Sequence, residues 1–408
     1  MNYRLSAIVV IALVLIACKP SVTPGAPSVA EDDLAARAAT LARESIIVDT
    51  HIDVPYRLVE KWEDVSVATD GGDFDYPRAV AGGLNAPFMS VYTPAGLEAE
   101  GRSKAVAEEL IDLVNRIVDE SPDKFAIALS PADIEEHFSK GLISLPMGME
   151  NGSPIEGDLA NVQHFFNRGI RYITLAHGLS NHISDSSYDD NKRWDGLSEF
   201  GEQVVREMNR LGIMVDISHV SDAAFSDVMD IATAPAIASH SSARHFTPGW
   251  ERNIADDMIV RLARNGGVVM INFGSSFLTQ KAQEYGPKRR AAQAAWMEEN
   301  GLEPTDEAVE AFNQAFEAEH GPYPYATLEE TLDHFDHVRN LVGIDHVGIG
   351  SDYDGVGDSL PVGLKDVSQY PNLVEGLLKR GYSDDDIRKI LGGNLLRVWR
   401  AVEAAATS

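Results

Sequence analysis

The sequence predicts a closed (β/α)8 barrel of the TIM type, and three observations support this fold class. Eight short, apolar and mostly β-branched segments alternate along the chain with helical patterns, which is typical of a parallel sheet. Eight is also the number of strand–helix units that closes such a barrel. Six of the eight segments end in His, Asp or Glu, at the strand ends where barrels of this class place their active sites.

The predicted strands follow one another at intervals along most of the chain, whose 408 residues suffice for one large barrel or for two to three domains. They cover residues 46–55, 84–92, 142–149, 169–176, 213–218, 235–239, 266–273 and 347–351. The first is an unbroken apolar run before it reaches polar residues, as expected for a strand buried on both faces. No repeat of fixed period is visible, so a solenoid is not expected.

Three of the intervening segments carry clear helix patterns. Residues 31–45 place acidic side chains in the first turn, where the helix dipole favours them. Residues 102–120 show apolar side chains at spacings of four, three and four, which predicts an amphipathic helix. Residues 200–211 repeat this pattern, and Gly212 is expected to end that helix.

Residues 31–408 are therefore predicted to form a single barrel domain with one long insertion. The segment 63–76 is polar and rich in Gly and Asp, so we expect a loop there. The insertion, at about 280–336, is acidic and partly helical by pattern. It is expected to extend over the barrel mouth between the seventh and eighth strands.

The N-terminal residues have the pattern of an export signal. Residues 1–17 hold one positive charge, Arg4, and then an apolar run of signal-peptide length that is too short for an ordinary membrane span. The run ends in Leu-Ile-Ala-Cys at Cys18, which resembles the lipobox of bacterial lipoproteins. Residues 18–30 are then a lipidated cysteine and a flexible tether. A plain secretory signal or an uncleaved anchor is the alternative.

The expected location is the bacterial cell envelope, as a periplasm-facing lipoprotein. Lys19 occupies the place of the aspartate associated with inner-membrane retention, so the outer membrane is favoured over the inner. Cys18 is the only cysteine, which excludes an intramolecular disulfide. The net charge of −29, from 34 basic and 63 acidic residues, argues against nucleic acid as a partner and is accounted for by solubility.

The first strand ends in a pair of potential metal ligands. His51 and Asp53 alternate along a strand, so they share one face and together suit a zinc-type ion. A lone histidine after an apolar strand is more often a hydrogen-bonded core residue. The prediction of a metal site therefore depends on the other strands, which end in Glu150, His177, His219, His240 and Asp352.

The number of these ligands favours two metal ions. A catalytic zinc typically uses three protein ligands and one open position, and the histidines with Asp53 and Glu150 exceed that number. Glu150 has two carboxylate oxygens and could bridge two ions. A water molecule held between the ions would lose a proton near neutral pH and attack a polarised carbonyl, with Asp352 accepting and relaying the proton.

At this point the chain resembles a known family, the membrane dipeptidase (renal dipeptidase) family of amidohydrolase-like zinc metallopeptidases. The resemblance extends over nearly the whole chain that follows the tether, in family order. The matching stretches are DTHIDVP at 49–55, GMENG at 148–152, LAHGLSN at 175–181, GLSEFGEQVVREMNRLGIMVDISHVS at 196–221, ASHSSAR at 238–244, RNIADD at 252–257, GIGSDYDG at 348–355 and GGNLLRVW at 392–399.

The resemblance implies a dipeptidase with two zinc ions per subunit, and often a homodimer, acting on L-Xaa-L-Xaa and L-Xaa-D-Xaa dipeptides. It implies a role for each matching residue. His51 and Asp53 match ligands of one zinc, His219 and His240 match ligands of the other, and Glu150 matches the bridging carboxylate. His177 matches the residue that steadies the substrate carbonyl, and Arg252 matches the residue that binds the substrate carboxylate. Asp352 matches the acid/base.

One segment departs from the mammalian pattern and leaves the substrate open. Residues 181–194, which should border the substrate side-chain pockets, differ from those relatives. A broader metal-dependent amidohydrolase acting on lactams, lactones or acylated amino acids therefore remains as a second hypothesis. A lipid-anchored binding protein that has lost catalysis is a third, which the complete ligand set argues against.

Overall fold

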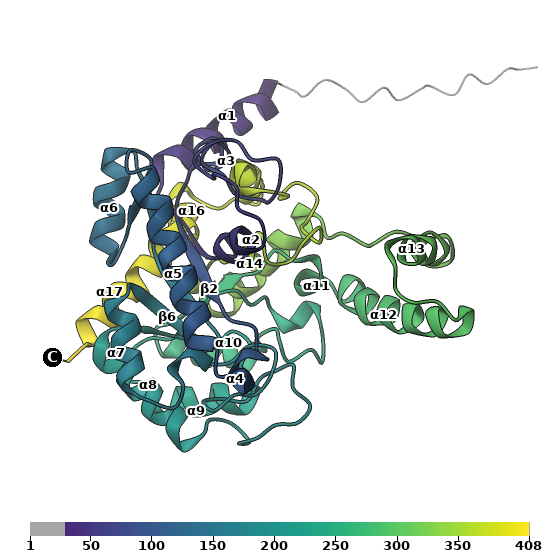
Figure 1. Cartoon of the computed structure of the whole chain (residues 1–408). Helices are drawn as coiled ribbons and strands as arrows, with labels where there is room; N and C mark the ends of the chain where they lie inside the picture. Colours follow the sequence, from purple (N-terminus) through teal and green to yellow (C-terminus); the bar gives the residue numbers. More distant parts are fainter. Residues whose placement is uncertain (1–28, 408) are drawn as a thin grey trace, which may run out of the picture.

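The computed structural model describes residues 29–407, and these form the predicted closed barrel (Figure 1). Eight parallel strands follow one another around it in the order β1-β10-β9-β8-β7-β6-β5-β2. Their bounds are β1 Ile47–Ile52, β2 Leu84–Tyr92, β5 Met147–Glu150, β6 Ile170–Thr174, β7 Met214–Asp216, β8 Ile237–Ala238, β9 Val268–Ile271 and β10 Val347–Ile349. The predicted signal peptide and Cys18 lie outside the described residues.

The third predicted strand, residues 142–149, was wrong as a single element, because it is divided at Pro146. Its first part, β4 (Ile143–Leu145), pairs with β3 (Phe125–Ile127) in a separate two-stranded parallel sheet. Its second part, β5, pairs with β2 and belongs to the barrel. Proline has no N–H for a strand ladder, and here only its carbonyl takes part, accepting from Met89 N at 2.8 Å.

Helices cover the outside of the barrel, and the three helices predicted from pattern are confirmed as α1, α5 and α8. The bounds are α1 Val29–Glu44, α2 Val54–Glu60, α3 Tyr76–Gly82, α4 Leu97–Glu100, α5 Ser103–Glu120, α6 Pro131–Lys140, α7 Ala160–Asn167, α8 Glu199–Leu211, α9 Asp222–Ile231, α10 Asp256–Arg264, α11 Ser275–Leu278, α12 Gln280–Asn300, α13 Asp306–His320, α14 Leu328–Val342, α15 Tyr370–Lys379, α16 Asp384–Arg388 and α17 Asn394–Ala405. Gly212 ends α8 in the left-handed conformation, at φ 82°.

Helix α2 was not expected, since residues 46–55 were predicted to be one strand. The strand ends at Ile52, and Asp53 becomes the N-cap of α2. Pro55 lies in the first turn of this helix, a position where its missing N–H costs nothing. His51 and Asp53 therefore come from a strand and a helix start, and not from one strand face.

The interior of the barrel is filled by side chains and closed by the C-terminal helix. Phe88 and Tyr172 point inward from β2 and β6, with ring centroids 5.5 Å apart. Trp399 of α17 packs against Phe88 at 5.4 Å and is fully buried. Tyr172 crosses β5 at Gly148, where a Cβ atom would lie only 1.9 Å from its ring.

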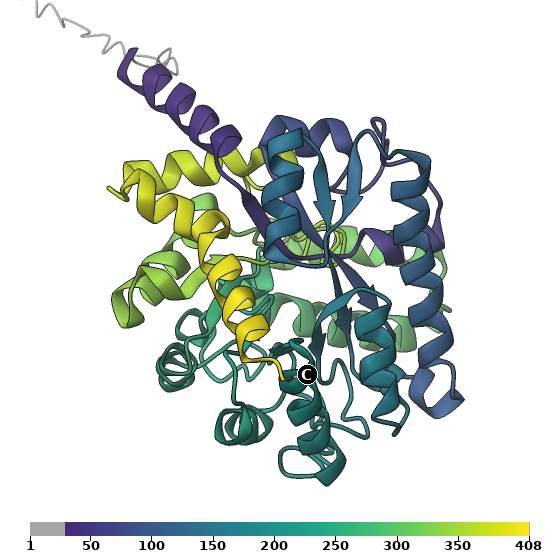
Figure 2. The ribbon, with the colours of Figure 1, turned by 90° about the vertical axis from the view of Figure 1, so that its left-hand side faces the viewer.

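The first and last barrel strands meet at a narrow join, which we call the β1–β10 seam. Their register contains one residue pair, Asp49 with Ile349. On the outside, α1 packs against α15, so the helix before β1 and a helix after β10 lie side by side (Figure 2). Beyond the strands, the seam is continued by Asp352 N donating to His51 O at 3.0 Å.

The long insertion forms a helical hairpin, α12–α13, that projects from the barrel (Figure 1). The hairpin has a small hydrophobic cluster of its own, built on Met297, Phe312 and Phe316. The predicted range of 280–336 overlaps the start of α14, which packs against α10 and α15 as one of the barrel helices.

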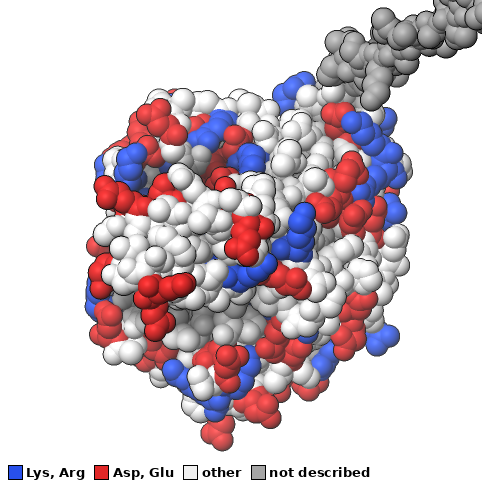
Figure 3. All heavy atoms as spheres, turned by 90° about the vertical axis from the view of Figure 1, so that its right-hand side faces the viewer, with Lys and Arg blue, Asp and Glu red and all other residues white. Residues whose placement is uncertain are grey.

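The described surface carries charges of both signs. On the face shown in Figure 3, acidic and basic side chains are interspersed without a broad basic area. Among residues 29–407, no helix combines the length and the apolar character needed to span a bilayer.

Candidate metal centre

The seven potential ligands named from the strand ends lie together at one end of the barrel. They come from β1, β5 and the segments that follow β1, β6, β7, β8 and β10. Six of them are buried, and the His177 side chain is 23% exposed. The structure thus brings together residues as far apart in the sequence as His51 and Asp352, as the carboxyl ends of barrel strands require.

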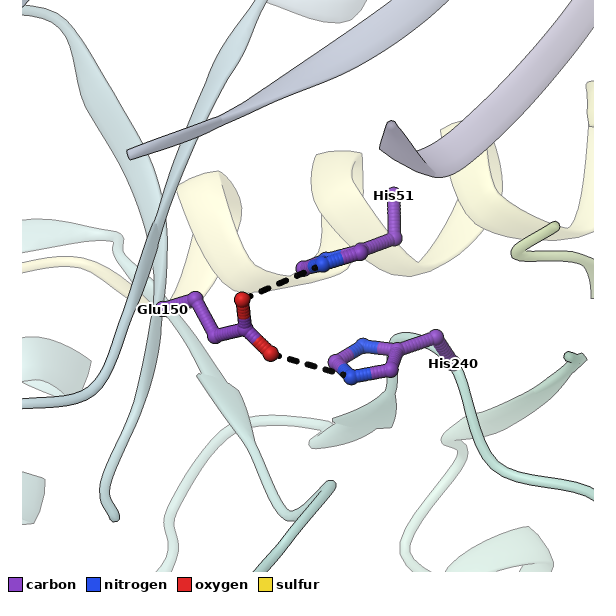
Figure 4. Close-up of side chains that lie close together, drawn as sticks. All are labelled: His51, Glu150 and His240. Atoms are coloured by element: carbon purple, nitrogen blue, oxygen red, sulfur yellow. Dashed lines mark ion pairs between the residues drawn. The ribbon is translucent and has the colours of Figure 1, made fainter. Parts of the chain in front are cut away.

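Glu150 lies at the centre of this group and faces histidines with both carboxylate oxygens (Figure 4). Its Oε2 is 3.4 Å from Nε2 of His51. Its Oε1 is 3.0 Å from Nε2 of His219 and 3.3 Å from Nε2 of His240. One carboxylate is therefore shared between two neighbouring sets of imidazoles.

The remaining ligands divide between the two sides of Glu150. His51, Asp53 and Asp352 form one group, in which Asp53 Oδ2 lies 3.4 Å from His51 Nε2. Glu150 forms a second group with His177 and His219, and a third with His51 and His240; within each group the ligand atoms lie within 4.8 Å of one another.

Buried hydrogen bonds orient two of the imidazoles. The Tyr172 hydroxyl lies 2.8 Å from Nδ1 of His51, and the Ser239 hydroxyl lies 2.8 Å from Nδ1 of His240. Ser239 in turn donates to the Asp216 carboxylate at 2.6 Å. With Nδ1 of each ring engaged in this way, Nε2 is left to face Glu150, as in metal sites whose histidines are held by a second layer of residues.

Three buried atoms of the ligand residues have no hydrogen-bond partner in the described chain, namely Nε2 of His51, Oδ1 of Asp53 and Nδ1 of His219. An unpaired buried polar atom costs about 1–3 kcal/mol, so such atoms call for a physical explanation. Coordination of a divalent ion provides one, because imidazole nitrogen and carboxylate oxygen are the ligands that zinc prefers alongside thiolate. The residues present therefore fit a metal ion.

The protonation states of His219, His240 and Glu150 suit metal binding. His51 differs: burial would lower its pKa, but the neighbouring Tyr172, Glu150 and Asp53 raise it well above the usual range. Burial holds the pKa of His219 and of His240 well below the usual range, and the nearby Arg252 guanidinium acts in the same direction. Burial alone would raise the pKa of Glu150, but the neighbouring His51 and His177 hold it well below its usual range. Neutral imidazole and ionised carboxylate are the forms that bind metal.

Asp352 differs from the other carboxylates of the centre. Burial raises its pKa to about 7, although the neighbouring His51 lowers it. Asn272 Nδ2 donates to Asp352 Oδ2 at 2.7 Å. Its backbone is left-handed, at φ 65°, and His219 is left-handed at φ 67°. Such conformations are costly for residues other than glycine and concentrate at functional sites.

Arg252 lies against the histidines and not on the cavity wall. Its Nη2 lies 3.0 Å from Nε2 of His219 and donates to the His240 carbonyl at 2.9 Å. Its Nη1 donates to the Ser241 hydroxyl at 2.7 Å, and its Nε is buried without a hydrogen-bond partner in the described chain. Arg252 is only 2% exposed.

The centre opens into a cavity of about 530 Å³. Besides the ligands, its wall is formed by Tyr56, Glu60, Tyr92, Tyr188, Phe277 and Val356, among others. Tyr188 belongs to the segment 181–194 that the sequence placed beside the substrate pockets, and its ring lies 5.8 Å from that of His219.

Sequence reasoning missed several residues that support the centre. Asn272 follows directly after β9. The predicted strand at 266–273 extended past it, and asparagine is not among the residue types that selected the other strand ends. Tyr172 and Asp216 lie within strands, and nothing in their local sequence indicates that they face buried imidazoles.

A closed parallel barrel that gathers imidazoles and carboxylates around a shared glutamate at the carboxyl ends of its strands defines a metal-dependent hydrolase. Residues 35–408 match the model of the membrane dipeptidase family, Peptidase family M19. The chain belongs to this family, as the sequence motifs predicted.

Curated relatives and solved structures agree with this membership. The chain is 36% identical to dipeptidase tcpJ of Claviceps purpurea, over 83% of this chain and 71% of the relative. It is 35% identical to dipeptidase aclJ of Aspergillus oryzae, over 83% of this chain and 72% of the relative. The structure of the probable dipeptidase PvdM from Pseudomonas aeruginosa matches with a TM-score of 0.77 and 27% identity, over 92% of this chain and 100% of that one.

A further solved relative has a dipeptide mimic bound. It is a metallopeptidase from Rhodobacter sphaeroides bound to a phosphinate mimic of the dipeptide L-Ala-D-Ala, with a TM-score of 0.71 and 25% identity, over 88% of this chain and 99% of that one. The family and these relatives make this chain a peptide-bond hydrolase of the metallodipeptidase type.

Proposed function

We propose that this protein is a dipeptidase that holds two zinc ions per subunit and hydrolyses dipeptides with a free C-terminal carboxylate, both L-Xaa-L-Xaa and L-Xaa-D-Xaa. One observation carries the proposal. The two oxygens of Glu150 face different imidazoles, His51 on one side and His219 with His240 on the other. The L-Ala-D-Ala mimic described for the Rhodobacter sphaeroides relative supports acceptance of a D-residue.

In this proposal His51 and Asp53 would hold one ion, His219 and His240 would hold the other, and Glu150 would contribute to both sites. When bound, such a pair of ions supplies an acidified water molecule as the nucleophile and polarises the scissile carbonyl.

The protein's own side chains do the remaining work. Asp352, kept in place by Asn272, accepts a proton on its carboxylate and passes it to the leaving amine nitrogen. A pKa of about 7 lets Asp352 do both near neutral pH. His177, the most exposed of the ligand-type histidines, steadies the oxygen of the substrate carbonyl. The family resemblance assigns the substrate carboxylate to Arg252, a task suited to a guanidinium; in this role Arg252 would have to exchange a hydrogen bond to Ser241 or to the His240 carbonyl for one to substrate.

The test is hydrolysis of a small panel by the metal-loaded protein lacking residues 1–18, with and without chelator. The panel holds L-Ala-L-Ala, L-Ala-D-Ala, L-Ala-L-Ala amide and N-acetyl-L-alanine. We expect chelator-sensitive cleavage of the two free dipeptides only. If the metal-loaded protein hydrolyses none of these compounds, the result would instead support a binding protein that has lost catalysis.

A broader amidohydrolase remains the second candidate because of one observation. Arg252 is buried beside His219, and among the described residues no Lys or Arg lines the cavity where it would demand a substrate carboxylate. Equal cleavage of the dipeptide and its amide would favour this candidate over the dipeptidase.

We further propose a lipid anchor at Cys18, attachment to the envelope on the periplasmic side, and a homodimer. The lipobox-like sequence supports the first two proposals, and family resemblance supports the third. Incorporation of radiolabelled palmitate into the wild type, and its loss in Cys18→Ser, would test the anchor. Light scattering of the protein lacking residues 1–18 would test the dimer.

A further inference from the structure

The cavity beside the metal centre has an excess of carboxylates. Five line it: Asp53, Glu60, Glu150, Asp352 and Asp354. Asp53 and Glu150 face His51, and Asp352 accepts from Asn272. These three acidic groups therefore have partners within the centre itself.

The two carboxylates farther from the centre differ in their partners. Asp354 accepts from Arg57 Nε at 3.1 Å and from the backbone N–H of Asp73 at 2.6 Å. The Glu60 carboxylate takes part in no hydrogen bond and no ion pair with the described residues, although Glu60 is exposed and lines the cavity. Glu60 is thus the one cavity carboxylate that the described protein leaves uncompensated.

Two tyrosines lead from the centre toward Glu60. Tyr56 and Glu60 are four residues apart on α2, so they lie on the same side of that helix. Tyr92, at the end of β2, packs edge-on against Tyr56 with ring centroids 5.0 Å apart. All three residues line the cavity, which therefore has an aromatic wall and a free negative charge on this side.

The position of α2 tells which part of a substrate this wall would meet. Asp53 is the N-cap of α2, so the start of this helix adjoins the His51 side of Glu150. Arg252 lies on the other side, against His219. A dipeptide whose carboxylate is directed to Arg252 therefore extends its N-terminal residue toward α2, a step that rests on the proposed function.

We propose that Tyr56, Tyr92 and Glu60 form a subsite for a basic side chain, that of lysine or arginine, on the N-terminal residue of the substrate. The methylene stem of such a side chain packs along the tyrosine rings while its charged end reaches the carboxylate. Aromatic rings also attract cations, so the wall and the charge favour the same group.

The first experiment compares L-lysyl-L-alanine with L-norleucyl-L-alanine, whose side chain keeps the stem and lacks the ammonium group. Glu60→Gln should lower the kcat/KM ratio of the lysyl to the norleucyl substrate by about two- to fivefold, the range expected for one solvent-exposed ion pair. The loss should appear in KM, because the charge lies away from the cleaved bond.

Two further variants sharpen the comparison. Glu109→Gln removes the same charge from an exposed position on α5 that does not line the cavity, and it should leave the ratio as in the wild type. Glu60→Lys should reverse the preference, so that L-glutamyl-L-alanine becomes better than the lysyl substrate. If Glu60→Gln and Glu109→Gln lower the lysyl-to-norleucyl ratio of kcat/KM equally, the effect comes from the general charge of the protein, and the subsite is overturned.

A binding measurement separates this inference from the proposed function. Phosphinate dipeptide mimics with a lysyl or a norleucyl side chain are titrated into wild type and Glu60→Gln by calorimetry, which needs no turnover. Tighter binding of the lysyl mimic only when Glu60 is present supports the subsite. Equal Kd values for the two mimics overturn it, whether or not the protein hydrolyses dipeptides.

Discussion

At the scale of single residues, Tyr172 connects the hydrophobic interior of the barrel to the metal centre. Its ring packs against Phe88 in the interior, and its hydroxyl lies 2.8 Å from Nδ1 of His51. A residue in this position acts on the metal through the orientation of a ligand and touches neither metal nor substrate.

We therefore expect Tyr172→Phe to lower metal affinity by about tenfold, the lower end of the effects seen for residues that orient metal ligands. The fold should persist, because the ring remains over Gly148. Chelator competition measures the affinity, and circular dichroism checks the fold. Tyr382→Phe removes a hydroxyl that bonds to Asp336, away from the centre, and serves as the control. Unchanged affinity in Tyr172→Phe would show that the hydroxyl does not position His51.

A second residue-scale feature is the pair Asp73 and Asp354, in which the backbone N–H of each residue donates to the side-chain carboxylate of the other. Asp354 N donates to Asp73 Oδ2 at 2.8 Å, and Asp73 N donates to Asp354 Oδ1 at 2.6 Å. Burial, and then the charge of Asp354, raises the pKa of Asp73 to about 7. The folded state thus keeps a proton that the unfolded state loses near pH 4.

The sign of the pH dependence follows from this difference. Between about pH 4 and 7 the folded chain binds more protons than the unfolded chain, so this pair makes the free energy of unfolding fall as pH rises through that window. Asp73→Asn should remove that dependence and stabilise the protein at pH 8 by about 1 kcal/mol, after allowance for solvent screening. Urea unfolding at pH 5 and pH 8 measures it. Asp70→Asn, in the same loop, is the control, and an equal pH dependence in wild type and Asp73→Asn would contradict the prediction.

At the scale of elements, the strands and helices with a strong period could be predicted from the sequence, and local exceptions could not. The strand at residues 84–92 and the helix at 102–120 carry their patterns in full and were found nearly to the residue. The effects of Pro146 and Pro55 on strand and helix boundaries were misjudged. The effect of a proline depends on whether its position needs the backbone N–H that proline lacks. That information resides in the packed structure.

The residues of the candidate site could likewise be predicted only in part. His51, Glu150, His219 and His240 could be named because each stands at or just beyond a strand end, a place that sequence alone reveals. The partners of these residues could not, since the contact between Tyr172 and His51 joins residues that are 121 positions apart. The burial of Arg252 likewise results from packing around Ser241, which no spacing predicts.

Strand β5 gives a prediction at this scale through Gly148. A Cβ atom there would lie 1.9 Å from the Tyr172 ring, within a fully buried interior. Gly148→Ala should cost about 2–3 kcal/mol in the free energy of unfolding, because overpacked cores must shift side chains or backbone. It should also weaken metal binding by displacing the ring that holds His51. Gly96→Ala, where an added Cβ meets nothing within 4 Å, should be nearly neutral in the same urea titrations.

At the scale of the whole molecule, the α12–α13 hairpin is an addition to a complete barrel. Its hydrophobic cluster is separate from the barrel core, and none of its residues lines the cavity at the metal centre. Its two ends lie close together, with the Tyr285 hydroxyl 3.2 Å from the Gly321 carbonyl to which it donates.

Excision of residues 286–320 should therefore leave a folded enzyme. We expect a Tm within about 5 °C of the wild type, a shift equivalent to roughly 1–2 kcal/mol for a domain of this size. Dipeptide kcat should stay within threefold. Calorimetry measures the Tm, and the substrate panel measures kcat. Loss of activity from a variant with an unchanged Tm would mean that the hairpin takes part in catalysis.

The β1–β10 seam has a consequence for how the first and last strands of the barrel are held together. Only the pair Asp49 and Ile349 joins the two strands in register, whereas His51 on one side and Asp352 on the other both face the metal centre. An ion held by His51 and Asp53 would attract the Asp352 carboxylate across this join and so stabilise the contact between β1 and β10. Removing metal should then loosen the pairing between β1 and β10 first. Amide hydrogen exchange would therefore accelerate along β1 and β10 well before it does in β6 or β7.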